Sequence, residues 1–299
     1  MIWNFVKGMA MGAADIVPGV SGGTIALVTG IYERLINGIK SVGWDTLVTL
    51  KDQGIKAAWQ QMDGTFLISV LLGAATSLVL MSRILHFLIE EQPIMLWSFF
   101  FGLVLASAVY VAKQIKNWTL IRAMLLMAGT AFAALISISP SVQLDVTSPI
   151  SLFFAGSIAI CAMILPGISG SFILLLLGMY GHMIGVLKSF EWVSMGIFAG
   201  GCLVGIMVFS RFLAWQLKHH HDSTMALLTG FMLGALLKLW PWKTVVSYRL
   251  NSSGEQVPFI ESPVWPWLQS EPQISVAIVA VIIGFSIVFV MDRLAKASN

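Results

Sequence analysis

Six long apolar runs constrain the fold of this chain more than any other feature. They cover residues 66–89, 94–112, 121–139, 193–217, 224–240 and 274–291. A helix needs about 20 apolar residues to cross about 30 Å of hydrocarbon, and each run reaches or approaches that length. Charged residues make up only 10% of the chain, whereas soluble domains carry about 25%. The sequence therefore predicts an all-α, multi-pass membrane protein.

One segment of the chain occurs twice. Residues 14–23 read ADIVPGVSGG and residues 162–171 read AMILPGISGS, which is 148 positions further on. The same spacing relates Gly30 to Gly178, and Tyr32 to Tyr180. We therefore predict two structural repeats, covering residues 1–140 and 149–299.

A second match defines an insertion in the first repeat. Ser82-Arg83 corresponds to Ser210-Arg211 at a spacing of 128, so the first half holds 20 additional residues between the two motifs. We assign them to residues 40–62, where Lys40, Lys51 and Lys56 lie among apolar residues. That mixture predicts an interfacial helix.

Each copy of the Pro-Gly-x-Ser-Gly motif interrupts an apolar stretch. Proline removes a backbone donor, and glycine permits left-handed conformations. The breaks fall at Pro18-Gly19 and Pro166-Gly167. We expect the chain to turn there inside the membrane and to form re-entrant helical hairpins over residues 1–38 and 150–187. Irregular backbone at that depth must be buried in protein or line a wet cavity.

Three predicted spans separate the two hairpins, and this odd number predicts that the second repeat is inverted. With this topology, eleven basic residues fall on one side: Lys7, Arg34, Lys40, Lys51, Lys56, Lys113, Lys116, Arg122, Lys218, Arg293 and Lys296. Four fall on the other: Lys188, Lys238, Lys243 and Arg249. An excess of Lys and Arg marks the cytoplasmic face, so both termini are predicted to be cytoplasmic. Hairpins that crossed the membrane completely would give the same count.

The segment 241–273 is predicted to be a periplasmic loop. Four tryptophans flank it: Trp240, Trp242, Trp265 and Trp267. Tryptophan is enriched at membrane–water interfaces, so we interpret these residues as interface anchors, with a ligand role as the alternative.

Inverted repeats with broken helices are a recurrent transporter design, in which half-helix N-termini face an anionic substrate. The first amides of a helix have no internal partner, and the helix dipole adds partial positive charge there. The second half-helices should begin near Ser21 and Ser169. The predicted phosphate-binding groups are therefore those of Ser21, Gly22, Gly23, Thr24, Ser169, Gly170 and Ser171. The alternative is that these small residues only allow close helix packing.

Arg83 and Arg211 are the second predicted element of the site. An arginine within an apolar span usually faces a cavity or a partner, and guanidinium groups bind phosphate through paired hydrogen bonds. Both lie near the ends of their spans, so snorkelling to the interface is the alternative. Asp15, whose counterpart is Met163, could carry a coupling proton, pair with either arginine, or cap a helix.

No catalytic residue, metal site or nucleic-acid partner is predicted. The tract His219–His221 resembles a metal-binding sequence, but Asp222 is the one carboxylate near it, so we interpret it as a basic cytoplasmic loop. No cofactor is expected beyond a coupling ion, for which H⁺ and Na⁺ both remain open.

Residues 11–24, MGAADIVPGVSGGT, closely resemble the signature of the PopT-type polyprenyl-phosphate transporters, a bacterial and archaeal membrane family long described as being of unknown function. The resemblance extends over essentially the whole chain. It implies a transporter that returns undecaprenyl phosphate from the outer to the inner leaflet of the cytoplasmic membrane, where the carrier is reused for peptidoglycan and other envelope polymers. We expect alternating access, contact with membrane lipids, and an oligomeric state that can include a homo-oligomer.

A second resemblance supplies the main competing function. Undecaprenyl-pyrophosphate phosphatases of the bacitracin-resistance type also pair two inverted hairpins, with a Pro-Gly-x-Ser-Arg-Ser motif. This chain has Gly22 and Gly170 at the arginine position, and residues 11–14 are Met-Gly-Ala-Ala where those enzymes carry glutamates. Phosphoanhydride cleavage therefore has no evident general base. Transport of a small soluble anion is the third alternative.

Overall fold

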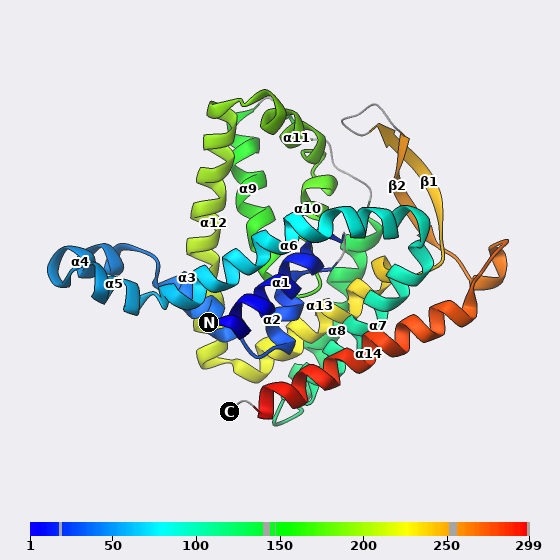
Figure 1. Ribbon diagram of the computed structural model, residues 1–299, viewed down its shortest axis with the longest axis horizontal. Coiled ribbons are helices and arrows are strands. Elements are labelled where there is room, and N and C mark those ends of the chain that lie inside the picture. Colours follow the sequence, from blue (N-terminus) through cyan, green and yellow to red (C-terminus); the bar gives the residue numbers. More distant parts are fainter. Residues whose placement is uncertain (18–19, 140–143, 147, 251–255, 298–299) are drawn as a thin grey trace.

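The computed structural model describes residues 1–17, 20–139, 144–146, 148–250 and 256–297. Five helices in it are long and apolar enough to cross a membrane, or six if the bent pair α10–α11 forms one span. The five are α6 (Gly64–Glu91), α7 (Pro93–Ala112), α8 (Leu120–Ile138), α12 (Trp192–His219) and α13 (His221–Leu239). The last helix, α14 (Ile274–Ala297), has a shorter apolar part, Ile274–Val290. The chain is thus a mostly helical, multi-pass membrane protein (Figure 1).

The N-terminal region consists of short helices. Helix α1 (Ile2–Ile16) is followed by α2 (Gly22–Val28) and α3 (Tyr32–Ser41). Helix α2 ends after two turns, and Gly30 beyond it has a φ of 71°. A left-handed residue of this kind stops a helix, and glycine adopts it without steric cost.

The segment that begins at residue 149 has the same order of elements. Helix α9 (Pro149–Ile164) is followed by α10 (Gly170–Leu176) and α11 (Tyr180–Ser189). Gly178, with a φ of 69°, ends α10 as Gly30 ends α2. Helices α10 and α11 are bent by 107° relative to each other. The pair Gly30 and Gly178, found from the 148-residue spacing, therefore has one structural role in both halves.

Helices α1 and α9 pack against long helices through glycine contacts. A methyl group on Gly8 or Gly12 of α1 would overlap the backbone of α6 at Val70 or Ala74. In the other half, a methyl group on Gly156 of α9 or Gly201 of α12 would overlap the backbone of the facing helix. Small residues allow this close approach in membranes. The packing interpretation of glycine thus applies to these contacts.

The remaining long helices pair across the two halves. Helix α14 packs along α7, where Gly102 lies against the backbone of Val281 and Gly284 lies against that of Phe99. Helix α8 packs along α13, where Gly230 lies against the backbone of Leu126. Each half therefore supplies a helix that covers a helix of the other half, which joins them into one body.

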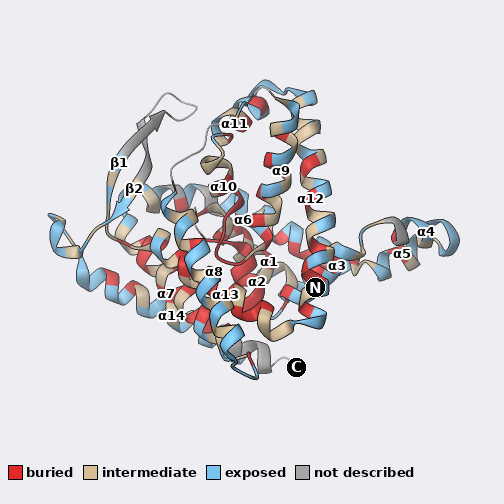
Figure 2. Cartoon of the chain, turned by 180° about the vertical axis from the view of Figure 1, so that it is seen from behind, coloured by how far each residue is buried: buried red, intermediate tan, exposed pale blue. Residues whose placement is uncertain are grey.

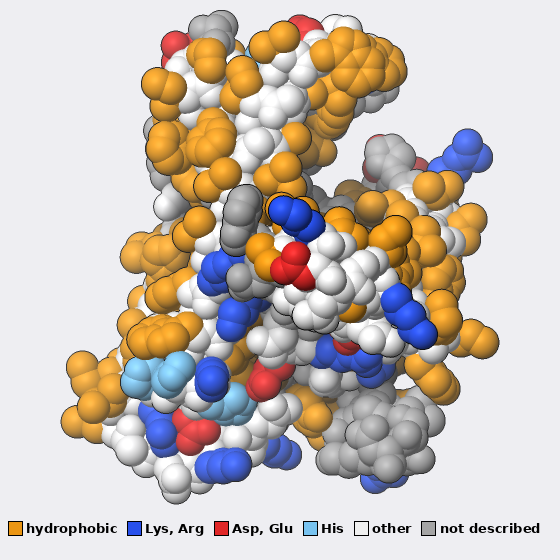
Figure 3. Space-filling model, turned by 90° about the vertical axis from the view of Figure 1, so that its left-hand side faces the viewer, with side chains coloured by type: hydrophobic (Ala, Val, Ile, Leu, Met, Phe, Trp, Pro, Cys, Tyr) orange, Lys and Arg blue, Asp and Glu red, His pale blue; other side chains and the backbone are white. Residues whose placement is uncertain are grey.

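The insertion between α3 and α6 forms two short helices, α4 (Trp44–Gln53) and α5 (Ile55–Gln61). They project from one side of the molecule, next to the N-terminus and α12 (Figure 1). Figure 3 shows this face, on which Lys, Arg and His side chains gather in the centre and lower part and apolar side chains dominate above. The additional residues of the first half thus form a separate peripheral feature.

The segment predicted as a loop contains a β-hairpin, which an all-α fold did not anticipate. Strand β1 (Lys243–Leu250) pairs antiparallel with β2 (Gln256–Pro263), and a short 3-10 helix η1 (Pro266–Leu268) follows. The run Thr244-Val245-Val246 has the β-branched side chains that favour a strand. Polarity led us to predict a loop, although the local composition favours a strand.

The tryptophans around this hairpin fasten it to the helices. Trp240 donates its indole N–H to the carbonyl of Val264 at 2.9 Å, and Trp242 donates to that of Pro272 at 2.7 Å. The rings of Trp265 and Trp267 stack with their centres 5.0 Å apart. These contacts give the tryptophans a structural role.

The core of the molecule surrounds α2. Every residue of α2 is buried, and the fully buried side chains Val17, Val20 and Ala26 lie in or beside it. Figure 2 shows this buried region at the centre, with exposed residues on α4, α5 and the outer helices. A helix that is apolar all round is stable only inside protein or membrane. The motif that precedes α2 is therefore held at the centre of the fold.

Candidate functional site

We call residues 20–24 the first tip and residues 166–171 the second tip. Ser21 is the N-cap of α2: its backbone is extended and its hydroxyl oxygen accepts from the amide of Gly23 at 3.0 Å. A serine at this position satisfies one of the free amides at a helix start. The predicted half-helix start at Ser21 agrees with the structure. Pro18 and Gly19, the predicted break, lie outside the described residues.

The first tip contacts the second half of the chain directly. The Ser21 hydroxyl donates to the carbonyl of Met163 at 3.1 Å, and the Thr24 hydroxyl oxygen accepts from the amide of Gly167 at 3.0 Å. Both Ser21 and Thr24 are fully buried. Gly23 lies so close to the carbonyl of Ile164 that a methyl group there would overlap it. The two copies of the motif, 148 residues apart in sequence, thus meet in space.

Tyr32 adds a contact that the sequence analysis missed. Its buried hydroxyl donates to the carbonyl of Ile164 at 3.3 Å. The match of Tyr32 to Tyr180 was the available signal, but a tyrosine pair does not reveal which backbone group it binds. Together with Ser21, this tyrosine fastens the end of α9 to the first half.

Asp15 has the role of a helix cap in this structure. Its Oδ1 accepts a hydrogen bond from the amide of Gly22, the first residue of α2, at 2.7 Å. Gly22 cannot carry a side chain here without overlapping Asp15. Among the described residues, no ion pair joins Asp15 to either arginine. An internal anion is therefore already bound at the first tip.

The second tip lacks such a carboxylate. Helix α10 starts at Gly170 without a side-chain cap, and the hydroxyls of Ser169 and Ser171 are hydrogen-bonded to each other at 2.8 Å. Met163, the counterpart of Asp15, lies beside Gly170. Gly167, with a φ of 84°, makes the turn after Pro166. The two tips are alike in backbone and differ in charge.

The two arginines lie in different surroundings. Arg83 is exposed on α6. Arg211, on α12, donates from Nη1 to the carbonyl of Met207 at 2.7 Å. Its other terminal nitrogen occupies the space that a side chain on Gly43 would need. Within the part of the chain that the structure describes, no hydrogen bond or ion pair joins either arginine to a tip. Their pairing in sequence therefore does not correspond to a common contact.

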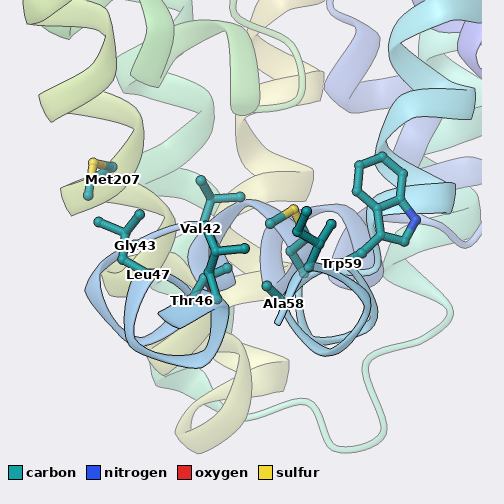
Figure 4. Close-up of a pocket in the computed structure, with 10 residues that line it drawn as sticks. Val42, Gly43, Thr46, Leu47, Ala58, Trp59 and Met207 are labelled. Atoms are coloured by element: carbon teal, nitrogen blue, oxygen red, sulfur yellow. The ribbon is translucent and has the colours of Figure 1, made fainter. Parts of the chain in front are cut away.

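The difference between the arginines arises from the insertion. Helices α4 and α5 and the turn at Val42-Gly43 form an apolar cavity of about 350 Å³ against Met207, four residues from Arg211. Figure 4 shows Val42, Gly43, Thr46 and Met207 on one side of it, and Ala58 and Trp59 on the other. The first half therefore places Gly43 and the cavity next to Arg211, whereas Arg83 is exposed on α6.

The histidine tract joins two helical regions. His221 lies 3.0 Å from Glu33 of α3 through Nε2 and 3.5 Å from Asp222 through Nδ1. Asp222 also pairs with Arg122 at the start of α8, at 3.0 Å. These partners connect α3, α13 and α8 on the side where basic residues are abundant.

The fold and these contacts define a multi-pass membrane protein with two related motifs in contact at its centre, and comparison with known proteins shows the class to be a transporter rather than an enzyme. The family described as undecaprenyl phosphate translocase-like matches residues 11–257. The chain belongs to this family.

Two relatives support the assignment. A polyprenyl-phosphate transporter of Vibrio cholerae is 43% identical over 298 residues, which cover 98% of this chain and 96% of that protein. A polyprenyl-phosphate transporter of Staphylococcus aureus is 34% identical over 259 residues, which cover 80% of this chain and 86% of that protein. No solved structure matches the chain.

Proposed function

We propose that this protein is a flippase that returns a polyprenyl phosphate, such as undecaprenyl phosphate, from the outer to the inner leaflet of the bacterial cytoplasmic membrane. The observation that carries the proposal is the similarity, over 98% and 80% of this chain, to two proteins named polyprenyl-phosphate transporter. A phosphate headgroup cannot cross hydrocarbon without substitute hydrogen bonds and countercharge. The protein supplies them, while the isoprenoid tail stays in the bilayer and the carrier is reused for envelope polymers.

The architecture behind this proposal is a pair of inverted repeats, each with a re-entrant hairpin. Matched elements support it, since α1 packs on α6 as α9 packs on α12. The excess of basic residues on one side supports cytoplasmic termini. Two inverted halves that meet at the midplane can rock against each other, which exposes one site to each leaflet in turn.

The headgroup site in this proposal lies between the tips. Hydroxyls of Ser169 and Ser171 provide neutral donors for phosphate oxygens, and the amides of Gly22 and Gly23 would provide two more once Asp15 and the Ser21 hydroxyl release them. Asp15 holds the Gly22 amide in the present state, so an incoming phosphate would displace this carboxylate. Repulsion between two anions favours protonation of one of them. This makes Asp15 the proposed coupling residue, with H⁺ as the coupling ion.

The arginines serve the two leaflets in this scheme. Arg211 lies beside Gly43 and four residues from Met207, which both line the apolar cavity, and Arg83 is exposed on α6. Each would attract the phosphate as the site opens to its own side, since a guanidinium donates paired hydrogen bonds to phosphate oxygens.

Leaflet-resolved transport by the purified protein in liposomes tests the function. The protein is expected to move undecaprenyl phosphate from one leaflet to the other. Undecaprenol, which lacks the phosphate, should show no protein-dependent movement between leaflets. Asp15→Asn should abolish the effect of an imposed pH gradient, with Asp52→Asn as an exposed control. Release of inorganic phosphate from undecaprenyl pyrophosphate would instead indicate a phosphatase, and uptake of free phosphate without lipid would indicate a soluble-anion carrier.

A further inference from the structure

Two lysines at the base of the β-hairpin share one carboxylate. Lys238, in the last turn of α13, and Lys243, the first residue of β1, lie 3.5 and 3.6 Å from the same oxygen of Glu261 on β2. The side chains are 15%, 7% and 21% exposed, respectively. The side predicted to be periplasmic has few basic residues, yet two of them converge here.

Lys243 is the less satisfied of the two lysines. Its ammonium nitrogen is buried and has no hydrogen-bond partner, and it lies 3.6 Å from the centre of the Trp97 ring. A buried cation is costly unless it is paired and hydrogen-bonded. When both lysines are protonated, two ammonium groups around one carboxylate leave one positive charge uncompensated. The group Lys238, Lys243 and Glu261, which we call the lysine cluster, therefore lacks an anion.

The lysine cluster lies next to the second tip. The Lys238 nitrogen is 5.2 Å from the centre of the Phe172 ring, and Phe172 directly follows Ser171 in α10. Trp97 belongs to α7, and Glu261 to the hairpin that stands beside these helices (Figure 1). A ligand held by the lysines would thus lie beside Phe172, in the first turn of α10.

We propose that Lys238 and Lys243 form a phosphate-binding site at the base of the β-hairpin, beside Phe172 of α10, where a phosphate monoester replaces Glu261. The ligand is a lipid phosphate or free phosphate, since both present the same dianionic group. Each ammonium has three donors, and charge-assisted hydrogen bonds to phosphate are stronger than neutral ones. Tryptophan is enriched where lipid headgroups lie, and Trp240, Trp242, Trp265 and Trp267 surround the base of the hairpin. For a lipid ligand the inference rests on the proposed function and adds its receiving site.

The competing explanation is that the lysine cluster only staples the hairpin to the helices. The two explanations differ in the effect of Glu261→Gln. If Glu261 competes with phosphate, its neutralisation strengthens phosphate binding. If the carboxylate only holds the hairpin against the helices, its neutralisation lowers the stability of the protein and leaves phosphate binding unchanged or weaker.

The experiment measures equilibrium binding to the purified full chain in lipid nanodiscs, with three probes: undecaprenyl phosphate, undecaprenol and inorganic phosphate. We expect Lys243→Gln and Lys238→Gln to weaken phosphate binding about tenfold or more, since each removes a charge-assisted bond. Glu261→Gln should tighten it severalfold. Lys188→Gln, an exposed lysine on α11, is the matched control and should change nothing. If Lys243→Gln fails to fold, Lys238→Gln decides, because it keeps the Lys243–Glu261 pair.

Leaflet-resolved transport with the same variants separates the two levels of the proposal. Active wild type with unchanged binding in all three variants would overturn the lysine site and leave the flippase intact. Inactive wild type that still binds inorganic phosphate through both lysines would overturn the flippase and retain the site. Weaker binding in the lysine variants, tighter binding in Glu261→Gln, and binding of undecaprenyl phosphate but not of undecaprenol would support both.

Discussion

At the residue scale, the contact between the two tips depends on a few hydroxyl groups. Thr24 is fully buried, and its oxygen is the partner of the Gly167 amide. Backbone donors in a membrane protein cannot turn to water when such a partner is lost. The same chemistry that would let the tips hold a phosphate therefore also holds the two halves together in the present state.

We predict that Thr24→Val destabilises the protein by about 1–3 kcal/mol, because the Gly167 amide is left buried without an acceptor. The measurement is the apparent melting temperature in detergent, together with transport. Thr76→Val is the control, since the Thr76 hydroxyl only donates to Leu72 within its own helix. Equal melting temperatures of the Thr24→Val variant and the wild type would show that the contact between the tips is dispensable.

A second prediction at this scale concerns pH. Burial lowers the pKa of Lys243 to about 7. The nearby Glu261 carboxylate raises this pKa, the Lys238 ammonium lowers it further, and the adjacent Trp97 ring carries no charge. The unfolded chain keeps this lysine protonated up to its ordinary pKa of 10.5, so unfolding takes up a proton between these values and stability rises with pH there.

Lys243→Met should therefore stabilise the protein most below pH 7, where the folded wild type holds a buried charge, and progressively less as the pH approaches 10.5. Thermal unfolding of both proteins over this range measures the difference. A constant difference between the two melting temperatures would show that Lys243 does not titrate in this range.

At the element scale, helix pairs are held by close backbone contacts at glycine. Gly201 of α12 lies against the backbone of Phe153 on α9, whereas its neighbour Gly200 has open space around it. The sequence shows two adjacent glycines that look equivalent. Only the packing of α9 on α12 distinguishes them, because one faces the partner helix and the other does not.

This difference supports a prediction with a matched control in adjacent positions. Gly201→Val should force α9 and α12 apart, at a cost of about 1–3 kcal/mol or more, and should lower the melting temperature by several degrees. Gly200→Val should be tolerated. Size-exclusion chromatography and thermal unfolding of both variants check this, and a similar loss in both would argue against the described helix contact.

At the scale of the whole molecule, helices from the two halves of the chain pack against each other. Helix α14 covers α7 and α8 covers α13, so neither half is complete alone. The insertion makes the two halves unequal, because the turn that leads into α4 and α5 lies against Arg211, whereas Arg83 is exposed on α6. A transporter with unequal sides can receive its substrate on one side and release it on the other.

The proposed inverted arrangement predicts that two exposed lysines, Lys188 on α11 and Lys218 on α12, face opposite sides of the membrane. In cells, a membrane-impermeant maleimide should label Lys188→Cys and should not label Lys218→Cys until the membrane is opened. Cys161 and Cys202 are first replaced by alanine. Labelling of both positions in intact cells, or of Lys218→Cys alone, would contradict the predicted orientation.

The class of the protein, the long apolar helices and the two related motifs were predictable from the amino-acid sequence. These follow from local properties, because apolar length decides what can cross hydrocarbon and Pro and Gly decide where a helix stops. The half-helix starts after Ser21 and Ser169 were predictable for the same reason. The β-hairpin was missed because polarity was given more weight than β-branched composition.

The groups that contact one another could be identified only from the folded structure. Asp15 caps α2 and pairs with neither arginine, Arg211 lies against Gly43, and Lys238 and Lys243 share Glu261. Each of these contacts joins separate segments of the chain. A contact of this kind depends on how whole helices pack, and no local pattern of residues specifies that packing.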